Sequence, residues 1–160
     1  MTRVQFMVAF LALLTAPALA GTGVSFAGLK TDPKAPVQVQ ADQLSINQTD
    51  GSATFSGNVV VTQSDLELKA ATVTVVYEQD GKGIAELHAT GGVTIRAGDN
   101  AASAEDAIYT VATAELVLSG KVLLAEGQAT LSGDKLTINL RTGLGTMDGR
   151  VTTTFAPGGN

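Results

Sequence analysis

The stretch FSGNVVVTQSDLELKAATVTV, residues 55–75, determines the fold that the sequence predicts. Apolar and polar residues alternate on either side of a short break at residues 63–65. Because the side chains of a β-strand point alternately to opposite faces, this pattern predicts two strands joined by a tight turn. One face carries mainly Ser, Asn, Thr, Gln, Glu and Lys. The other face is apolar and consists of Phe55, Val59, Val61, Leu66, Leu68, Val73 and Val75.

A Gly-x-Val element recurs four times along the chain. Its first glycines are Gly57, Gly91, Gly120 and Gly149, at spacings of 34, 29 and 29 residues. Each element is preceded by a pair of small or acidic residues, at 41–42, 70–71, 104–105 and 133–134. A glycine inside a strand marks a bulge or a bend. Four bends at equivalent places therefore predict sheets that curl around a shared interior.

The composition favours an all-β domain. Of the 160 residues, 44% are hydrophobic, 18 are Gly and none is Trp, and Val, Ile, Leu and Thr are abundant. No helical period follows residue 20. Strict alternation begins at residues 37–46, and Thr49-Asp50-Gly51 then provides a hairpin turn signal. We therefore expect one domain over residues 37–157, built as an antiparallel β-jelly-roll or β-sandwich.

The first twenty residues are typical of an export signal. Arg3 precedes a nine-residue apolar run at 6–14, and Ala18-Leu19-Ala20 matches a small-x-small cleavage site. Pro17 interrupts the apolar run before the length of about 20 residues that a membrane span needs. We therefore expect a cleaved signal peptide at 1–20, a flexible leader at 21–36 and a polar tail at 158–160. The signal and the absence of Cys predict a periplasmic protein without disulfides.

The sequence offers little for catalysis, for metal binding or for a cofactor. His88 is the single histidine, and it lies on the polar face of an alternating run. There is no G-x-S-x-G element and no Cys. Four acids, Asp42, Glu105, Asp106 and Asp134, recur at strand openings, and these positions favour solvated turn and edge residues over paired catalytic carboxylates. The net charge of −5 and the lack of a basic cluster disfavour nucleic acid as a partner.

The apolar face is therefore the main functional feature of the sequence. It is lined almost wholly by aliphatic side chains and continues through all four repeats. Such a face suits a surface for alkyl chains, and it suits a sealed core as well. The residues expected to line the interior are Ile46, Phe55, Val59, Val61, Leu68, Val73, Val75, Leu87, Val93, Ile95, Leu118, Val122 and Leu124.

Residues 55–63, FSGNVVVTQ, closely resemble a TGNVxVTQ-like segment that is characteristic of the OstA-like family. This family comprises the jelly-rolls of the periplasmic lipopolysaccharide-transport proteins LptA, LptC and LptD. Residues 36–42 and 68–75 resemble its first strand and the strand after its first hairpin. Residues 150–157 resemble its closing strand. The resemblance extends over about residues 36–157.

This resemblance implies a single, slightly twisted β-jelly-roll that is open at its terminal edges. It implies a periplasmic carrier or bridge, with no catalytic step, that holds the lipid A acyl chains of lipopolysaccharide between its sheets. The implied partners are the inner-membrane jelly-roll component LptC, the N-terminal jelly-roll of outer-membrane LptD, and further copies of the chain stacked head to tail. The expected assembly edges are the first strand, with Val37 and Val39, and the closing strand, with Val151, Thr153 and Phe155.

Two other hypotheses remain at this point. A membrane-anchored, LptC-like component of the same machine would retain the N-terminal apolar segment. A structural β-repeat module would have a dry core and no ligand.

Overall fold

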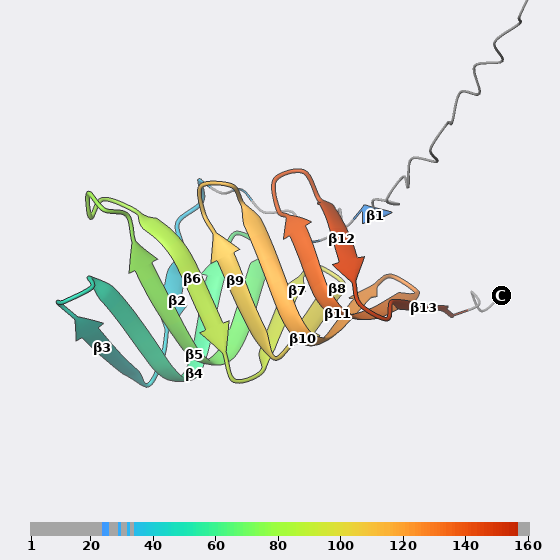
Figure 1. Ribbon diagram of the computed structural model, residues 1–160, viewed down its shortest axis with the longest axis horizontal. Coiled ribbons are helices and arrows are strands. Elements are labelled where there is room, and N and C mark those ends of the chain that lie inside the picture. The colour runs from blue at the N-terminus through green and yellow to red at the C-terminus, as the bar shows by residue number, and fades with distance from the viewer. Residues whose placement is uncertain (1–23, 26–28, 30–31, 33, 157–160) are drawn as a thin grey trace, which may run out of the picture.

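The computed structural model describes residues 24–25, 29, 32 and 34–156 (Figure 1). In this part of the chain thirteen antiparallel strands form one continuous sheet, and no α-helix is found. The strands are β1 (Val24–Ser25), β2 (Gln38–Gln40), β3 (Gln43–Asn47), β4 (Ser52–Gln63), β5 (Leu66–Tyr77), β6 (Ile84–Thr90), β7 (Val93–Ala97), β8 (Asn100–Ala104), β9 (Asp106–Thr110), β10 (Glu115–Glu126), β11 (Ala129–Asn139), β12 (Leu144–Asp148) and β13 (Thr152–Phe155).

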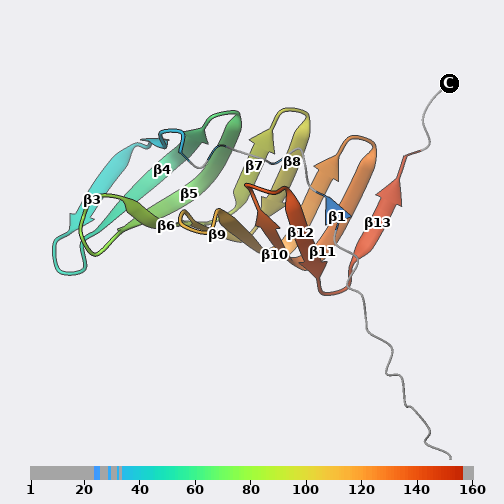
Figure 2. The same cartoon turned by 90° about the horizontal axis from the view of Figure 1, so that it is seen from above.

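Four long strands fold this sheet into two layers. β4 pairs with β3 along its first half and with β2 along its second half. In the same way β5 pairs first with β7 and then with β6, β10 first with β9 and then with β8, and β11 first with β13 and then with β12. We call the two layers the β6 layer and the β7 layer. The β6 layer holds β3, β6, β9, β12 and β1, and the β7 layer holds β2, β7, β8 and β13. The long strands contribute one half to each layer, so that the layers face each other as a jelly-roll (Figure 2).

The hairpin predicted over residues 55–75 is the β4–β5 pair. The two strands pair from Ala53 opposite Val75 to Gln63 opposite Leu66, with one shift of register between Ser56 and Val59. Ser64, in the two-residue turn, has a φ of 51°, which fits the positive φ that two-residue hairpin turns of this kind require. The all-β jelly-roll predicted from the alternation is thus confirmed.

The recurring glycines lie where the chain passes from one layer to the other. Strand pairing shifts register between residues 56 and 59 of β4 and between residues 119 and 122 of β10. Gly57 and Gly120, within these shifts, have φ values of 79° and 80°. Such values are readily adopted by glycine and cost other residues free energy. The predicted bends at the glycine repeats are confirmed as the corners of the jelly-roll.

An acidic residue sits beside each of three corner glycines. The backbone N–H groups of Asp42, Glu105 and Asp134 donate hydrogen bonds to the carbonyls of Gly57, Gly120 and Gly149, at 2.9, 2.9 and 3.0 Å. The acidic side chains bind the residue that follows each glycine, at 2.8 Å to Asn58, 2.7 Å to Lys121 and 3.0 Å to Arg150. These acids are exposed, as expected, and they also tie each corner to the neighbouring strand.

Aliphatic side chains from both layers fill the space between them. Val73, Ile95, Leu118, Leu136 and Ile138 are all fully buried. Leu29 is buried as well, with 1% of its surface exposed, and it belongs to the same cluster. In addition, β1 pairs with β12. The expected flexible leader at 21–36 is therefore wrong at Val24–Ser25 and at Leu29, because these residues are held by backbone pairing and by the core.

The first predicted strand, residues 37–46, is two strands in the structure. β2 lies in the β7 layer and β3 in the β6 layer, and the corner at Ala41-Asp42 separates them. The apolar positions change phase at this corner, from odd numbers (Val37, Val39, Ala41) to even numbers (Leu44, Ile46), so the strict alternation expected over residues 37–46 is wrong. The closing strand begins at Thr152, one residue later than the predicted Val151.

Candidate functional site

The interior face of the β6 layer consists of two apolar rows that run across its strands from β3 to β11 or β12. Direct cross-strand neighbours form the first row, which contains Ile46, Ala53, Val75, Leu87, Tyr109, Leu116 and Ile138. The second row contains Leu44, Phe55, Val73, Ala89, Ala107, Leu118, Leu136 and Met147. Cross-strand neighbours share a face, so each row is a continuous apolar track from β3 to β11 or β12.

The β7 layer presents a matching row on its own inner face. This row runs through Val39, Val61, Leu68, Ile95, Ala102, Leu124, Leu131 and Thr153. Val59, Val93 and Val122 lie nearer the corners of the same layer, and each is 1% exposed. The two layers thus enclose one apolar interior along the length of the molecule.

Most of the predicted lining residues are buried in this interior. Eleven of them are less than 8% exposed: Val59, Val61, Leu68, Val73, Val75, Leu87, Val93, Ile95, Leu118, Val122 and Leu124. Phe55 is partly buried and packs against the same cluster. Ile46 is on the interior face but is 66% exposed. It is exposed because β3 is the last strand of its layer and pairs only with β4.

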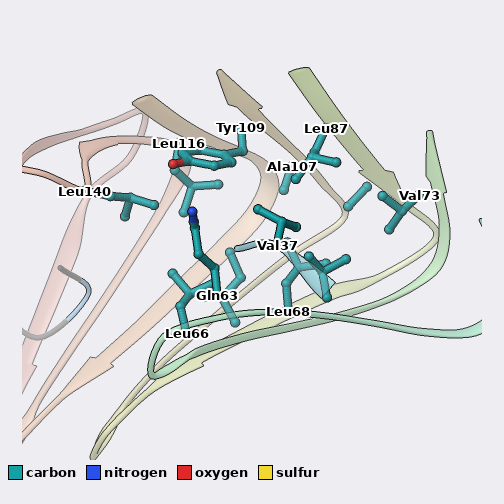
Figure 3. A pocket seen from close by; sticks show the side chains of 13 residues that line it. Val37, Gln63, Leu66, Leu68, Val73, Leu87, Ala107, Tyr109, Leu116 and Leu140 are labelled. Carbon is teal, nitrogen blue, oxygen red and sulfur yellow. The ribbon is translucent and has the colours of Figure 1, made fainter. Parts of the chain in front are cut away.

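A small cavity lies between the layers (Figure 3). Its walls include Val61, Leu68 and Ile95 from the β7 layer and Val73, Leu87 and Tyr109 from the β6 layer. The cavity volume is about 30 Å³, which leaves room for only one or two water molecules. An alkyl chain therefore enters this interior only if the two layers or their side chains move apart.

Two polar side chains interrupt the apolar walls of the cavity. Gln63 is 4% exposed, and its Nε2 donates a hydrogen bond to the carbonyl of Ala35 at 3.0 Å. Tyr109 is 6% exposed, and its hydroxyl has no hydrogen-bond partner within the described structure. Burial raises the pKa of Tyr109, and the nearby charge of Arg141 opposes this shift. Both residues occupy apolar-face positions of the alternation, and a polar residue at such a position is the signal that could have identified them.

The two ends of the molecule expose apolar side chains that belong to the interior face. Leu44 and Ile46 on β3 are 51% and 66% exposed at one end. Phe155 on β13 is 74% exposed at the other, opposite Ala129 of β11. Edge positions were predicted for both regions, and the structure does place β2, β3 and β13 at the borders of the sheet. Of the named edge residues, Val37 and Val39 are partly buried, whereas Val151, Thr153 and Phe155 are exposed.

The outer face carries the polar and charged groups. His88 lies there, and its Nε2 is 2.9 Å from a carboxylate oxygen of Glu86. The other Glu86 oxygen accepts a hydrogen bond from the hydroxyl of Thr110. Among the residues that the structure describes, no group of His, Cys, Asp or Glu is arranged to hold a metal ion. The described residues also include no helix that is long and apolar enough to cross a membrane.

The family of this chain follows from its similarity to known proteins. Residues 38–144 match the family model described as LptA/(LptD N-terminal domain) LPS transport protein. The chain belongs to this family. Its members are lipopolysaccharide-transport proteins and not enzymes, and the matched residues extend from β2 to the start of β12.

Two curated relatives match most of the chain. An "Uncharacterized protein" of Rhizobium meliloti (strain 1021) is 30% identical over 145 residues, which is 85% of this chain and 78% of the relative. The "Lipopolysaccharide export system protein LptA" of Escherichia coli (strain K12) is 26% identical over 131 residues, covering 78% and 71% of the two chains.

A solved structure shares the fold. It is the crystal structure of LptH, described as the LptA homologous periplasmic component of the lipopolysaccharide transport device from Pseudomonas aeruginosa. The TM-score is 0.71 at 21% sequence identity, over 79% of this chain and 99% of that one. The jelly-roll inferred from the family resemblance is thus also the fold of this solved structure.

Proposed function

We propose that this protein is a periplasmic carrier that shields the lipid A acyl chains of lipopolysaccharide on their way from the inner to the outer membrane. The observation that carries the proposal is the apolar track, which continues across the strands of both layers and ends in exposed apolar residues at each end of the molecule. A sealed core does not need exposed ends. A path along which a chain slides does.

The free energies involved favour such a carrier. Each CH₂ group that leaves water contributes about 0.8 kcal/mol, so several acyl chains cannot cross the aqueous periplasm unshielded. Aliphatic side chains offer non-directional contacts, which retain an alkyl chain without fixing its position along the track. The small volume of the empty interior means that the carrier opens by separating its layers as it loads.

Partners at both ends complete the proposed path. One end exposes β2 and β3 and the other exposes β13, so a copy of the chain, or another jelly-roll, docks there by adding strands to the sheet. We propose the jelly-roll of LptC as the partner on the inner-membrane side and the N-terminal jelly-roll of LptD as the partner on the outer-membrane side. A head-to-tail contact of this kind is heterologous and extends into a filament. The energy for transport comes from an inner-membrane machine.

Photo-crosslinking tests the interior path. A photo-reactive residue at Val61, Val75 or Leu118 should capture lipopolysaccharide in living cells. The matched controls are the adjacent positions Val60, Val76 and Val117, whose side chains lie on the opposite face of the same strands. Capture at the control positions alone would exclude the interior path.

The form of the mature protein and its lipid content test the remaining alternatives. Mass spectrometry of the N-terminus should show cleavage after Ala20. An intact N-terminus would favour an anchored, LptC-like component. Protein purified from its native envelope should contain lipopolysaccharide. If it contains none, and purified protein fails to bind lipopolysaccharide at micromolar concentration, the protein is a structural β-repeat module instead.

A further inference from the structure

The hydroxyl of Tyr109 is an unpaired polar group within the apolar interior. Tyr109 is 6% exposed, and its hydroxyl oxygen is buried without a hydrogen-bond partner in the described structure. Burying an unsatisfied hydroxyl costs about 1–3 kcal/mol. Phe would fill the same space without this cost. This cost would be relieved if the hydroxyl found a hydrogen-bond partner in another state of the protein, in which a ligand occupies the interior.

The surroundings of this hydroxyl define the chemistry of that partner. Leu87 and Leu116 are its direct cross-strand neighbours, and Leu140 lies against the same cavity. Among the described residues that line the cavity, Gln63 is the second with a polar side chain, and its amide nitrogen is already bonded to the carbonyl of Ala35. A buried water usually needs two to four polar partners. A mostly aliphatic lining, in which the Tyr109 hydroxyl is unpaired and the Gln63 amide is already engaged, instead suits an alkyl chain that carries an oxygen.

The position of Tyr109 in the fold indicates which part of such a chain it meets. Tyr109 is the penultimate residue of β9, and Gln63 is the last residue of β4. The two side chains come from opposite layers and point toward each other across the cavity, as Figure 3 shows. The polar groups are thus near the ends of the strands, while Val73 and Leu118 lie further along the layer. An oxygen close to the head-group end of a chain would reach Tyr109 as the alkyl part extends inward.

We propose that Tyr109 hydrogen-bonds an oxygen substituent, either a hydroxyl or an ester, on an acyl chain held in the interior. The inference rests on the proposed carrier function. It adds selectivity for an oxygen-bearing acyl chain to an interior whose other contacts are non-directional. A phenolic hydroxyl both donates and accepts, so either substituent satisfies it. An unsubstituted alkyl chain leaves it unpaired, and such a chain binds more weakly.

Binding of three synthetic ligands to the full-length mature protein tests this assignment. The ligands are N-acylglucosamines whose long acyl chain is unsubstituted, carries a 3-hydroxyl or carries a 3-acyloxy ester. The wild-type protein should bind one or both oxygen-bearing ligands about 2- to 10-fold more tightly than the unsubstituted one, as expected for one hydrogen bond. The comparison between the hydroxyl and the ester identifies which oxygen is recognised.

The variant Tyr109→Phe removes the hydroxyl and retains the ring. It should bind all three ligands equally and unfold at the same temperature as the wild type or a higher one. The matched control is Tyr77→Phe, which removes the hydroxyl of a tyrosine that is 43% exposed at the end of β5. This control should retain the wild-type preference.

The possible outcomes separate the inference from the function on which it rests. If the wild-type protein binds none of the ligands and no lipopolysaccharide, the carrier function fails and the inference fails with it. Equal binding of the three ligands by the wild type keeps the function and overturns the inference. A preference that persists in Tyr109→Phe overturns it also, and so does a lower unfolding temperature of this variant, because the hydroxyl would then have a partner in the free protein.

Discussion

Single residues determine where the jelly-roll turns its corners. Gly120 has a φ of 80°, and an added Cβ would collide with Glu105. We expect Gly120→Ala to lower the free energy of unfolding by about 1–3 kcal/mol, through backbone strain together with this collision. Urea denaturation measures the loss.

Gly127 provides the matched control for this corner. It also has a positive φ, of 57°, but nothing lies within 4 Å of a Cβ placed there. Gly127→Ala should therefore cost less than Gly120→Ala, since it adds backbone strain without a collision. Equal losses for the two variants would show that the close approach of Glu105 contributes nothing to the corner.

Burial of Tyr109 makes the stability of the folded protein depend on pH in the alkaline range. The pKa of this side chain is raised above its ordinary value of 10.0, chiefly by desolvation. Its neutral form is thus favoured more in the folded state than in the unfolded state. The unfolded state loses this proton first, so stability is unaffected below pH 10 and falls as the pH rises from there towards the folded-state pKa.

Comparison with Tyr109→Phe isolates this contribution from the titration of lysines. The difference in unfolding free energy between the variant and the wild type should be constant up to about pH 9 and should grow in favour of the variant above pH 10. Chemical denaturation at a series of pH values measures it. A difference that stays constant throughout would mean that Tyr109 titrates normally in the folded protein.

At the scale of strands, the sequence predicted the pattern of the sheet better than its borders. Alternation and glycine spacing reveal β4, β5 and the corners, because each depends on the period of two or on a local φ. The split of residues 37–46 into β2 and β3 was missed, although the apolar positions change phase between Ala41 and Leu44, because a shift of one residue within a polar pair is a weak local signal. The contribution of Leu29 to the core was missed too, because a single apolar residue in an irregular segment produces no period.

The interior was predicted with similar limits. Eleven of the predicted lining residues are buried, since alternation assigns a face. Alternation does not show how far the opposite layer extends, so the exposure of Ile46 could not be predicted from it. The prediction that the interior binds lipid came from the family resemblance and not from periodicity, because a sealed core and a lipid path share one pattern of aliphatic side chains.

The exposed apolar residues of β3 give a test of assembly at the scale of elements. Leu44 and Ile46 are more than half exposed, and a second copy of the chain docked at this end would cover them. Each large apolar side chain that becomes fully buried contributes about 1.5–3 kcal/mol. We therefore expect Leu44→Ser with Ile46→Ser to weaken self-association at least tenfold, as measured by sedimentation velocity.

Two further variants complete the assembly test. Phe155→Ser, at the opposite end, should produce a similar loss, because a head-to-tail contact uses both ends of the molecule. Leu123→Ser replaces a residue that is 45% exposed on the outer face of β10 and should leave assembly unchanged. If Leu123→Ser dissociates the oligomer and the variants at the two ends do not, the copies associate through their flat outer faces.

The charge of the whole molecule distinguishes apolar binding from electrostatic binding. The sequence has ten Lys and Arg against fifteen Asp and Glu, and lipopolysaccharide is also anionic. Long-range forces therefore oppose the encounter, and salt screens them with a Debye length of about 10 Å at 0.1 M. Burial of acyl chains, by contrast, does not weaken as salt is added.

We therefore expect the affinity for lipopolysaccharide to stay constant or to rise as NaCl is increased from about 0.05 M to 0.5 M, a range over which the Debye length falls several-fold. Equilibrium binding with divalent cations removed by a chelator measures this, since such cations would bridge the two anionic partners. A steep fall in affinity with salt would place the main contacts between basic side chains and the phosphates of the head group. The interior would then be a sealed core, and the apolar track would have no part in transport.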